Sequence, residues 1–280
     1  MIEYYMKNTC ALIVTYYPDE VRINNFISNI IDEVNIIIIV DNTPEDKSPI
    51  TDDRIVLIRN HSNKGIAYAQ NQGIFEAIKR NVKYLFFFDQ DSDVNKGYFS
   101  EMLSALTKLE KVDKVSAIGP NLSDKYSSKE CCTRKDFLIS SGTLSDIDVF
   151  REVGLFNSGL FIDMVDVEWC HRARKYKYNC YVAEHISMKH NVGENNYPKF
   201  FGKEVRIGSP IRQYYLVRNW ILCIKSDSFD MFYKIKILYL MLKKIPLFML
   251  CVPRKKRIKY IFQGVLDGLS SKIGIYSGRS

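Results

Sequence analysis

The chain has 280 residues, of which 46% are hydrophobic, 13% aromatic and 26% charged, and its formal net charge is +8. This composition excludes a mainly disordered protein, and the apolar runs are far shorter than the roughly 18 residues of a membrane-spanning helix, which excludes an ordinary integral membrane protein. The charge also excludes a uniformly basic protein, because the last 50 residues contain eleven Lys or Arg and one acidic residue, while the first 230 carry a net charge of −2.

Short apolar runs and helical spacings alternate along the first 120 residues. The predicted strands are 10–15, 34–40, 54–58, 84–88 and 115–118, and the predicted helices are 19–32, 65–79 and 98–109. Such alternation is typical of an α/β fold, with a mostly parallel sheet that helices cover on both faces. Beyond residue 120 the pattern is looser, and it predicts strands at 137–141, 178–183 and 186–190 and helices at 166–177 and 210–225.

Polar clusters follow three of the predicted strands, at 15–17, 41–42 and 89–91. In open α/β sheets the ligand binds outside the carboxyl ends of the strands, so these clusters are expected to converge on one site. The alternative for any single cluster is a turn or a helix cap, because Asp and Asn favour both.

The cluster Asp89-Gln90-Asp91 ends a strand of large apolar residues. Two carboxylates one residue apart, at the edge of a cleft, suit a hard divalent cation that also bridges substrate phosphates. The alternative is an ordinary acidic loop, since this triplet is common by chance.

The helix before this strand opens with small residues at 63–73. Small residues allow a close approach to the sheet or to a ligand, and the N-terminus of a helix favours an anion. The alternative is that these residues only pack the helix on the sheet.

In their order and spacing, these segments resemble the family 2 glycosyltransferases with the GT-A fold. The resemblance covers roughly residues 8–225, and it is carried by Val14-Thr15-Tyr16 with Pro18, Val40-Asp41-Asn42, Asn63 to Gly73, Asp89-Gln90-Asp91, Gly159 to Asp163, and Asp166 to Cys170 with Arg172. A finer resemblance, to the rhamnosyltransferase branch, is carried by Asp89 to Ser92 together with Arg212, Tyr214-Tyr215 and Arg218-Asn219.

The resemblance implies a nucleotide-diphosphate-sugar donor and a divalent cation. The implied donor-binding residues, with Asp41 at the base, are Thr15, Tyr17, Asp41, Asn42, Asn71, Asp89, Arg212 and Arg218. The implied cofactor is Mg²⁺ or Mn²⁺, held by Asp89, Asp91 and His190, and it would neutralise the diphosphate leaving group. A structural or exposed His190, and packing or surface roles for the two arginines, are the alternatives.

The resemblance also implies a general base at the start of the helix predicted for 166–177. The family usually has Glu-Asp there, whereas this chain has Val165-Asp166, so Asp166 is left to take the proton from the acceptor hydroxyl. Capping of the helix by Asp166 is one alternative, and Asp163 as the base is another. Glu168 is a candidate for acceptor binding. The reaction implied by the family is a single inverting displacement without an enzyme nucleophile.

The C-terminal region 231–280 is apolar, aromatic and basic at once. A spanning helix at 231–250 would bury four lysines, at a cost of about 10 kcal/mol, and would contain Pro246. We therefore expect this segment to lie in the membrane interface, with the basic cluster at 254–257 on anionic lipid. The side chains expected to enter the lipid are Phe232, Tyr233, Ile237, Leu238, Leu240, Met241, Phe248 and Met249. Packing on the body is the alternative, and nucleic-acid binding is disfavoured because no recognised module accompanies the charge.

We therefore predict a GT-A glycosyltransferase domain at 1–228 and an amphipathic, basic helical region at 229–280. The predicted activity is metal-dependent, inverting transfer of a sugar, expected to be L-rhamnose from dTDP-rhamnose, to a lipid-linked or growing surface polysaccharide. The alternatives are a hexosyltransferase that uses a UDP-sugar and, from another class, a non-catalytic membrane-surface module. A sugar nucleotidyltransferase is disfavoured because 15–19 lack a Gly-rich basic loop. No secretory signal is evident, so we expect a cytoplasmic protein, peripheral on the inner face of the cell membrane, with its oligomeric state open.

Overall fold

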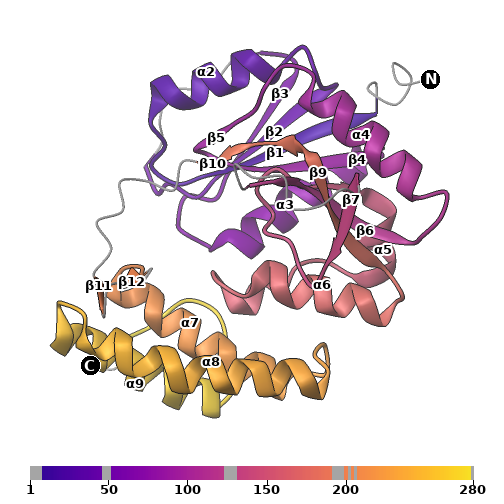
Figure 1. Ribbon diagram of the computed structural model, residues 1–280. Coiled ribbons are helices and arrows are strands. Elements are labelled where there is room, and N and C mark those ends of the chain that lie inside the picture. Colours follow the sequence, from indigo (N-terminus) through magenta and orange to yellow (C-terminus); the bar gives the residue numbers. More distant parts are fainter. Residues whose placement is uncertain are drawn as a thin grey trace.

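The computed structural model describes residues 8–45, 52–122, 131–190, 199–200, 203–204 and 207–278, with backbone alone at 189–190, 199–200 and 203–204. An eight-stranded sheet in the order β3-β2-β1-β4-β8-β6-β9-β7 forms its centre (Figure 1). The strands of this sheet are β1 (Thr9–Thr15), β2 (Ile36–Asp41), β3 (Ile55–Arg59), β4 (Tyr84–Asp89), β6 (Val115–Asn121), β7 (Cys132–Lys135), β8 (Leu144–Asp146) and β9 (Asn179–Ser187). Two separate pairs are β5 (Ser92–Asp93) with β10 (Lys189–His190), and β11 (Lys199–Phe200) with β12 (Lys203–Glu204).

Helices cover both faces of the sheet, which confirms the predicted α/β class (Figure 1). One face carries α2 (Glu20–Ile30) and α4 (Tyr98–Leu109), and the other carries α3 (Ile66–Lys79), α5 (Ile147–Val153), the 3-10 helix η1 (Ser158–Leu160) and α6 (Val165–Lys175). Helix α3 lies very close to the sheet, because a Cβ at Gly73 would be only 2.1 Å from Leu12 Cδ1. Its small residues therefore serve close packing on β1.

The first four strands run parallel, and their carboxyl ends meet at one edge of the sheet. All residues of β1 and β2 are buried, which is why these strands read as continuous apolar runs. The register pairs Thr15 with Asp41 and Asp41 with Arg59, and it pairs Val14 with Asp89. The polar clusters that follow these strands in the sequence are therefore neighbours in space.

The second half of the sheet differs from the prediction. Residues 137–141 form no strand; the chain instead turns and enters β8, which pairs antiparallel with β4 and β6. The turn needs Gly142, whose φ is +78°, and its N–H donates to the Phe87 carbonyl oxygen (2.7 Å). Strands β9 and β10 cover the two strands predicted for 178–190, but the break falls at residue 188 and not at 184–185, and β7 is an antiparallel edge strand. With three residues, β8 is too short to show an alternating pattern.

Helices α7 (Pro210–Lys225), α8 (Met231–Leu250) and α9 (Arg254–Leu269) lie together at the end of the molecule near α6 (Figure 1). Helix α9 packs against α7 through two glycines: a Cβ at Gly264 would be 2.7 Å from the Tyr214 carbonyl oxygen, and one at Gly268 would be 3.0 Å from that of Arg218. A boundary at residue 228 would separate these two helices, so a division ahead of α7 fits the packing better. Within the described residues, every helix falls short of the length and apolarity needed to cross a bilayer.

Candidate active site

A hydrogen-bonded cluster surrounds Asp41 at the carboxyl end of β2. Its Oδ1 accepts hydrogen bonds from the Thr15 hydroxyl (2.9 Å) and from the N–H (3.1 Å) and hydroxyl (2.7 Å) of Thr43. Arg59 Nη1 lies 3.6 Å from the second oxygen, Oδ2. Asp41 is thus held in one orientation at the sheet edge, and Thr15, which is itself buried, acts on the site through Asp41.

Two tyrosines link this cluster to the acidic loop after β4 (residues 89–92). The N–H of Tyr16 donates to Gln90 Oε1 (2.7 Å), and the N–H of Tyr17 donates to the Thr43 hydroxyl (2.9 Å). The residues Tyr16 and Tyr17 are 44% and 48% exposed, so both rings are open to a ligand at the edge of the sheet.

The acidic loop carries the predicted metal ligands. The N–H of Asp89 donates to Ser92 Oγ (3.1 Å), and the carbonyl oxygen of Asp91 accepts from Arg22 Nη2 (2.5 Å). Strand β10 pairs with β5 so that His190 lies opposite Ser92. The backbone of His190 is therefore beside the loop, while its side chain lies outside the described part of the chain.

The carboxylates of Asp89 and Asp91 fit a divalent cation as a partial ligand set. Among the side chains that the structure describes, no three from Asp, Glu, His and Cys gather closely enough to hold a metal by themselves. Mg²⁺ at phosphate sites is usually held by one or two carboxylates, and water and phosphate oxygens complete its shell. The oxygen donors of this loop are of the kind that binds a cation together with its phosphate ligand.

Asp166 lies half-buried in the first turn of α6, where it lines a small apolar cavity. The pKa of its carboxyl is raised to about 7, mainly by burial and further by the negative charges of Asp89 and Asp163, whereas hydrogen bonds from Ser140 lower it. The N-cap of α6 is Met164, without a capping side chain, so Asp166 does not act as a cap. A carboxyl that titrates near neutral pH is suited to accepting a proton during turnover.

Asp163, the competing base, pairs with Arg212. The guanidinium donates from Nε to both carboxylate oxygens (3.1 Å each) and from Nη2 to Oδ1 (2.9 Å). The loop around Asp163 is strained, since φ is +65° at Phe161, +63° at Asp163 and +64° at Met164. Each such residue costs about 1–3 kcal/mol and persists only where the surrounding fold supports it. Arg212 meets the site through Asp163 and is otherwise exposed.

Arg218 and Asn219, both fully buried in α7, provide this support. Arg218 donates to the carbonyl oxygens of Leu160 (2.9 Å) and Gly274 (2.5 Å). Asn219 Nδ2 donates to three carbonyl oxygens within 160–163, at 2.7–2.9 Å. The predicted donor contact of Arg218 is therefore wrong: a guanidinium with no exposed surface, bonded to the backbone, cannot reach a ligand.

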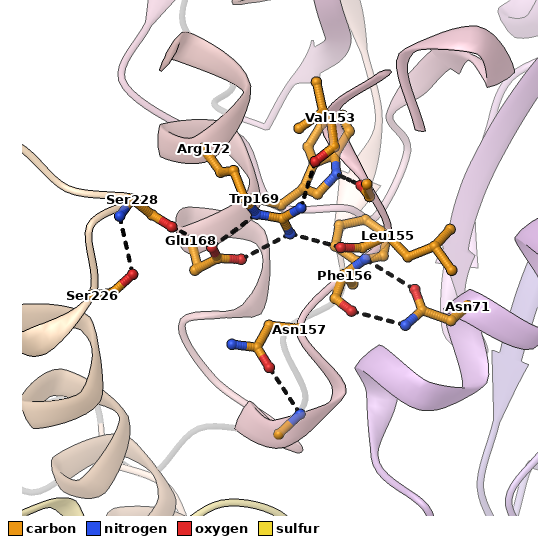
Figure 2. Close-up of polar contacts among 12 residues, drawn as sticks. Asn71, Val153, Leu155, Phe156, Asn157, Glu168, Trp169, Arg172, Ser226 and Ser228 are labelled. Carbon is orange, nitrogen blue, oxygen red and sulfur yellow. Dashed lines mark hydrogen bonds and ion pairs between the residues drawn. The ribbon is translucent and has the colours of Figure 1, made fainter. Parts of the chain in front are cut away.

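Two more predicted donor-binding residues, Asn42 and Asn71, are buried and bonded within the fold. Asn71 donates to the carbonyl oxygen of Phe156 (2.8 Å) and accepts from its N–H (3.0 Å), as Figure 2 shows. Asn42 donates to the Gly65 carbonyl oxygen (3.3 Å) and accepts from Asn60 Nδ2 (2.9 Å). These two predictions are corrected as well, because both carboxamides hold loops in place and have little polar surface left for a ligand.

A polar network joins α6 to the loop after α5 and to the C-terminal helices (Figure 2). Glu168, which is 4% exposed, accepts from Arg172 Nε (3.0 Å) and Nη2 (3.1 Å) and from the Ser228 hydroxyl (2.7 Å). Arg172 also donates to the carbonyl oxygens of Val153 (2.8 Å) and Leu155 (2.6 Å). Glu168 is thus structural, and the acceptor-binding role predicted for it is wrong.

A cavity of about 570 Å³ opens at the ends of β6 and β7, on the other half of the sheet from Asp41. Its lining includes the exposed side chains of Phe137 and Ile139 and the buried Glu184. Ser141, also in the lining, lies within hydrogen-bond distance of the acidic loop, with its Oγ 3.1 Å from Ser92 Oγ. The cavity therefore borders the acidic loop from the side opposite to the Asp41 cluster.

The turn at 140–143 is the part of the site that the sequence analysis missed. It falls where a strand was predicted, although the residues Ser-Ser-Gly-Thr are a turn signal that could have located it. No local pattern indicates that this turn crosses the end of β4 and meets both the acidic loop and α6.

Known proteins are similar to this chain in sequence and in fold. A sequence model described as Glycosyl transferase family 2 matches residues 11–137. The dTDP-rhamnosyl transferase RfbF of Shigella flexneri is 30% identical over 97% of this chain and 98% of its own. The structure of S. aureus TarS 1–349 in complex with UDP-GlcNAc is similar with a TM-score of 0.59 and 13% identity, over 92% of this chain and 81% of that one. GalNAc-T7 with UDP, GalNAc and Mn²⁺ has a TM-score of 0.60 and 12% identity, over 94% of this chain and 56% of that longer chain.

At such low identity the solved structures establish the fold, and the fold is GT-A. The relative that matches along nearly the whole chain establishes the family. The chain is a glycosyltransferase, and it belongs to glycosyl transferase family 2.

Proposed function

We propose that this enzyme transfers L-rhamnose from dTDP-rhamnose to a carbohydrate acceptor by a single inverting displacement. The observation that carries the proposal is the grouping of carboxylates at one end of the sheet, where the charge of Asp89 helps to raise the pKa of Asp166. The choice of donor is supported by the near full-length relative, which is named a dTDP-rhamnosyl transferase.

The nucleotide base would bind beside Asp41. Asp41 is buried, with 8% of its side chain exposed, and its Oδ1 already accepts three hydrogen bonds. The oxygen that we propose for the ring N–H of a pyrimidine is therefore Oδ2, which also lies 3.6 Å from Arg59 Nη1. The exposed rings of Tyr16 and Tyr17 offer surfaces for stacking. Thymine and uracil both carry this N–H, so a UDP-hexose is the second candidate donor, supported by the UDP-GlcNAc in the similar TarS structure.

The acidic loop would hold Mg²⁺ or Mn²⁺ through Asp91 and Asp89, with His190 as a proposed third ligand. Support comes from the oxygen donors of the loop and from the Mn²⁺ in the similar GalNAc-T7 structure. When bound, the cation neutralises charge that develops on the diphosphate.

Asp166 would accept the proton of the acceptor hydroxyl as that oxygen attacks the anomeric carbon. Its raised pKa and its freedom from helix capping support this role. Asp163 is the weaker candidate, because its carboxylate is engaged by the guanidinium of Arg212.

The acceptor sugar would enter through the cavity next to Ser141. Phe137, which is partly exposed in this lining, offers an aromatic surface to the apolar face of a pyranose. This arrangement would bring donor and acceptor to the reaction centre from opposite halves of the sheet. A lipid-linked glycan is the acceptor we propose, since the C-terminal helices expose a surface suited to a membrane.

A donor panel tests the reaction. In the presence of Mn²⁺ or Mg²⁺, dTDP-rhamnose is expected to be consumed, with release of dTDP, much faster than UDP-glucose or UDP-GlcNAc. Preferential consumption of a UDP-hexose would contradict the proposed donor, and no consumption of any nucleotide sugar would contradict the reaction.

Asp91→Asn is expected to reduce metal-dependent turnover by about 10²-fold or more, since a neutral amide holds the cation poorly. The thermal unfolding midpoint should change little, because this carboxylate lies in a loop. Asp93→Asn, an exposed position two residues further on, is the matched control and should retain turnover. Full activity of Asp91→Asn would contradict the metal assignment.

We also propose that the exposed face of α8 docks on an anionic membrane surface. Its apolar stripe consists of side chains 47–80% exposed, namely Met231, Phe232, Ile235, Leu238, Tyr239 and Leu242. Exposed cations lie on the same helix at Lys236, Lys243 and Lys244, and others open the next helix, α9, at Arg254, Lys255 and Lys256. Apolar side chains beside lysines on one helix are typical of interfacial helices.

The face agrees with the one predicted from the sequence at Phe232 and Leu238, which are exposed, and differs from it at three buried positions. Tyr233, Ile237 and Phe248 are buried in the core of the C-terminal helices, so they cannot enter lipid. Arg257 is also buried, and its Nη1 donates to the Gly208 carbonyl oxygen (2.9 Å). One side of the helix thus packs on its neighbours, in line with the alternative prediction of packing on the body. The other side exposes the apolar stripe defined above.

The double variant Phe232→Glu, Leu242→Glu is expected to weaken binding to phosphatidylglycerol vesicles by about tenfold or more, because each change removes a large apolar side chain and adds a repelled charge. Val112→Glu is the matched control, since Val112 is 81% exposed after α4 and far along the chain from α8. Sedimentation with the vesicles measures the effect. Equal binding of wild type and double variant would contradict the proposal, and a wild-type dimer that the double variant disrupts would assign the face to a second copy.

A further inference from the structure

The turn at 140–143 is anchored across the end of β4. The N–H of Gly142 donates to the Phe87 carbonyl oxygen (2.7 Å), and the hydroxyl of Tyr98 donates to the Gly142 carbonyl oxygen. A Cβ at Gly142 would be 2.7–2.9 Å from three neighbouring atoms. The turn is therefore closely packed at Gly142, which holds the two serines before it in place.

On one side of the turn, Ser141 holds the acidic loop. Ser141 Oγ lies 3.1 Å from Ser92 Oγ, and Ser92 Oγ accepts the N–H of Asp89 (3.1 Å). Ser141 and Ser92 are each only 2% exposed, so water competes little for these bonds. The hydroxyl pair thus fixes the backbone from which the Asp89 carboxylate projects.

On the other side of the turn, Ser140 faces Asp166, and the two residues line the same small cavity. Gln70 Nε2 of α3 donates to the Ser140 hydroxyl oxygen (2.9 Å), and the Ser140 carbonyl oxygen accepts from the hydroxyl (2.7 Å) and N–H (2.9 Å) of Thr143. Because Gln70 donates to Ser140, the hydroxyl proton of Ser140 is left for another acceptor. The Asp166 carboxylate is hydrogen-bonded by the backbone N–H of Ser140 and by its hydroxyl, and both bonds lower the pKa of Asp166, the N–H more than the hydroxyl.

We propose that the adjacent residues Ser140 and Ser141 form a clamp that sets the position of the general base relative to the acidic loop. Ser140 is the positioning residue for Asp166, and Ser141 is the positioning residue for Asp89. An inverting displacement needs the base and the leaving group on opposite sides of the anomeric carbon, and a misplacement of about 1 Å can cost about 10²-fold in rate. The inference rests on the proposed function, in which Asp166 is the base.

Alanine substitutions separate the two arms of the clamp. Ser140→Ala is expected to lower kcat for dTDP-rhamnose by about tenfold or more, with the Kd for dTDP and Mn²⁺ unchanged. Ser141→Ala is expected to weaken binding of dTDP in the presence of Mn²⁺, as measured by titration calorimetry. Ser145→Ala is the matched control, because Ser145 lines the same cavity but donates to the Ser116 carbonyl oxygen (2.8 Å).

Wild-type protein that does not turn over dTDP-rhamnose would overturn the proposed function itself. With an active wild type, the clamp is overturned if Ser140→Ala keeps the kcat of Ser145→Ala, or if Ser141→Ala keeps its affinity for dTDP and Mn²⁺. Should Ser140→Ala fail to fold, Gln70→Leu releases the same hydroxyl from the other side and is expected to lower kcat in the same way.

Discussion

Replacing Asp166 with Asn is expected to lower kcat by about 10²- to 10⁴-fold while the Kd for dTDP and Mn²⁺ stays near the wild-type value. Asparagine keeps the shape of the side chain but cannot take the proton of the acceptor hydroxyl. Asp163→Asn, on the loop just before α6, is the matched control and should cost less in kcat, because Asp163 is engaged by Arg212. The reverse order of the two effects would assign the base to Asp163.

The pH dependence of turnover tests the same carboxyl. Since burial raises the pKa of Asp166 to about 7, the base is protonated below that pH and ionised above it. In wild-type enzyme kcat/KM should therefore rise as the pH increases through about 7 and then level off. A cation on the acidic loop favours the ionised form of Asp166, so added Mn²⁺ should move the rise of kcat/KM, the acid limb of the profile, to lower pH. The limb should be absent in Asp166→Asn, and a flat wild-type profile between about pH 6 and 8 would contradict the assignment.

Replacing Arg218 with Ala is expected to lower the free energy of unfolding by about 3–5 kcal/mol, through the cavity it leaves and the hydrogen bonds it removes. Arg218 is fully buried, and it ties α7 to the loop before α6 and to Gly274 beyond α9. Its guanidinium also lies over the rings of Tyr214 and Tyr215, at 5.3 and 5.1 Å. Urea unfolding of wild type and variant measures the difference.

The matched control is Arg212→Ala, on the same helix but with 54% of its side chain exposed. The ion pair of Arg212 with Asp163 is exposed on the arginine side, and loss of such a pair costs about 1 kcal/mol, so this variant should lose much less stability than Arg218→Ala. A stable Arg218→Ala protein with weakened dTDP binding would restore the donor-binding role predicted from the sequence.

The parallel half of the sheet and the candidate site at its edge were predictable from the sequence. Three strands of this half, β1, β2 and β4, are buried on both faces, so they appear as continuous apolar runs, and polar residues follow each of these runs at once. Thr15, Asp41 and Asp89 meet for this reason: parallel strands in register bring their carboxyl ends together. The partners of these side chains, such as Thr43 and Gln90, were not predictable.

The buried asparagines and arginine were misassigned because their partners are distant in the sequence. Asn71 bonds to Phe156, 85 residues away, and Arg218 to Leu160, 58 residues away. A polar residue inside a motif reads the same whether it faces a ligand or an internal carbonyl group. The hydrogen-bond partners of the side chain distinguish the two cases, and those partners are set by the packed fold.

By itself, the sequence determined the fold class, the order of strands and helices in the parallel half of the sheet, and the carboxylates at the edge of that half. These features follow from local apolar patterns and from the polar residues that come directly after each strand. The tertiary structure alone decided which polar residues are left for ligands and which stripe of α8 is exposed, and it alone brought Ser140 and Ser141 between the acidic loop and Asp166. Those outcomes depend on packing between segments far apart in the chain, and no local pattern records that packing.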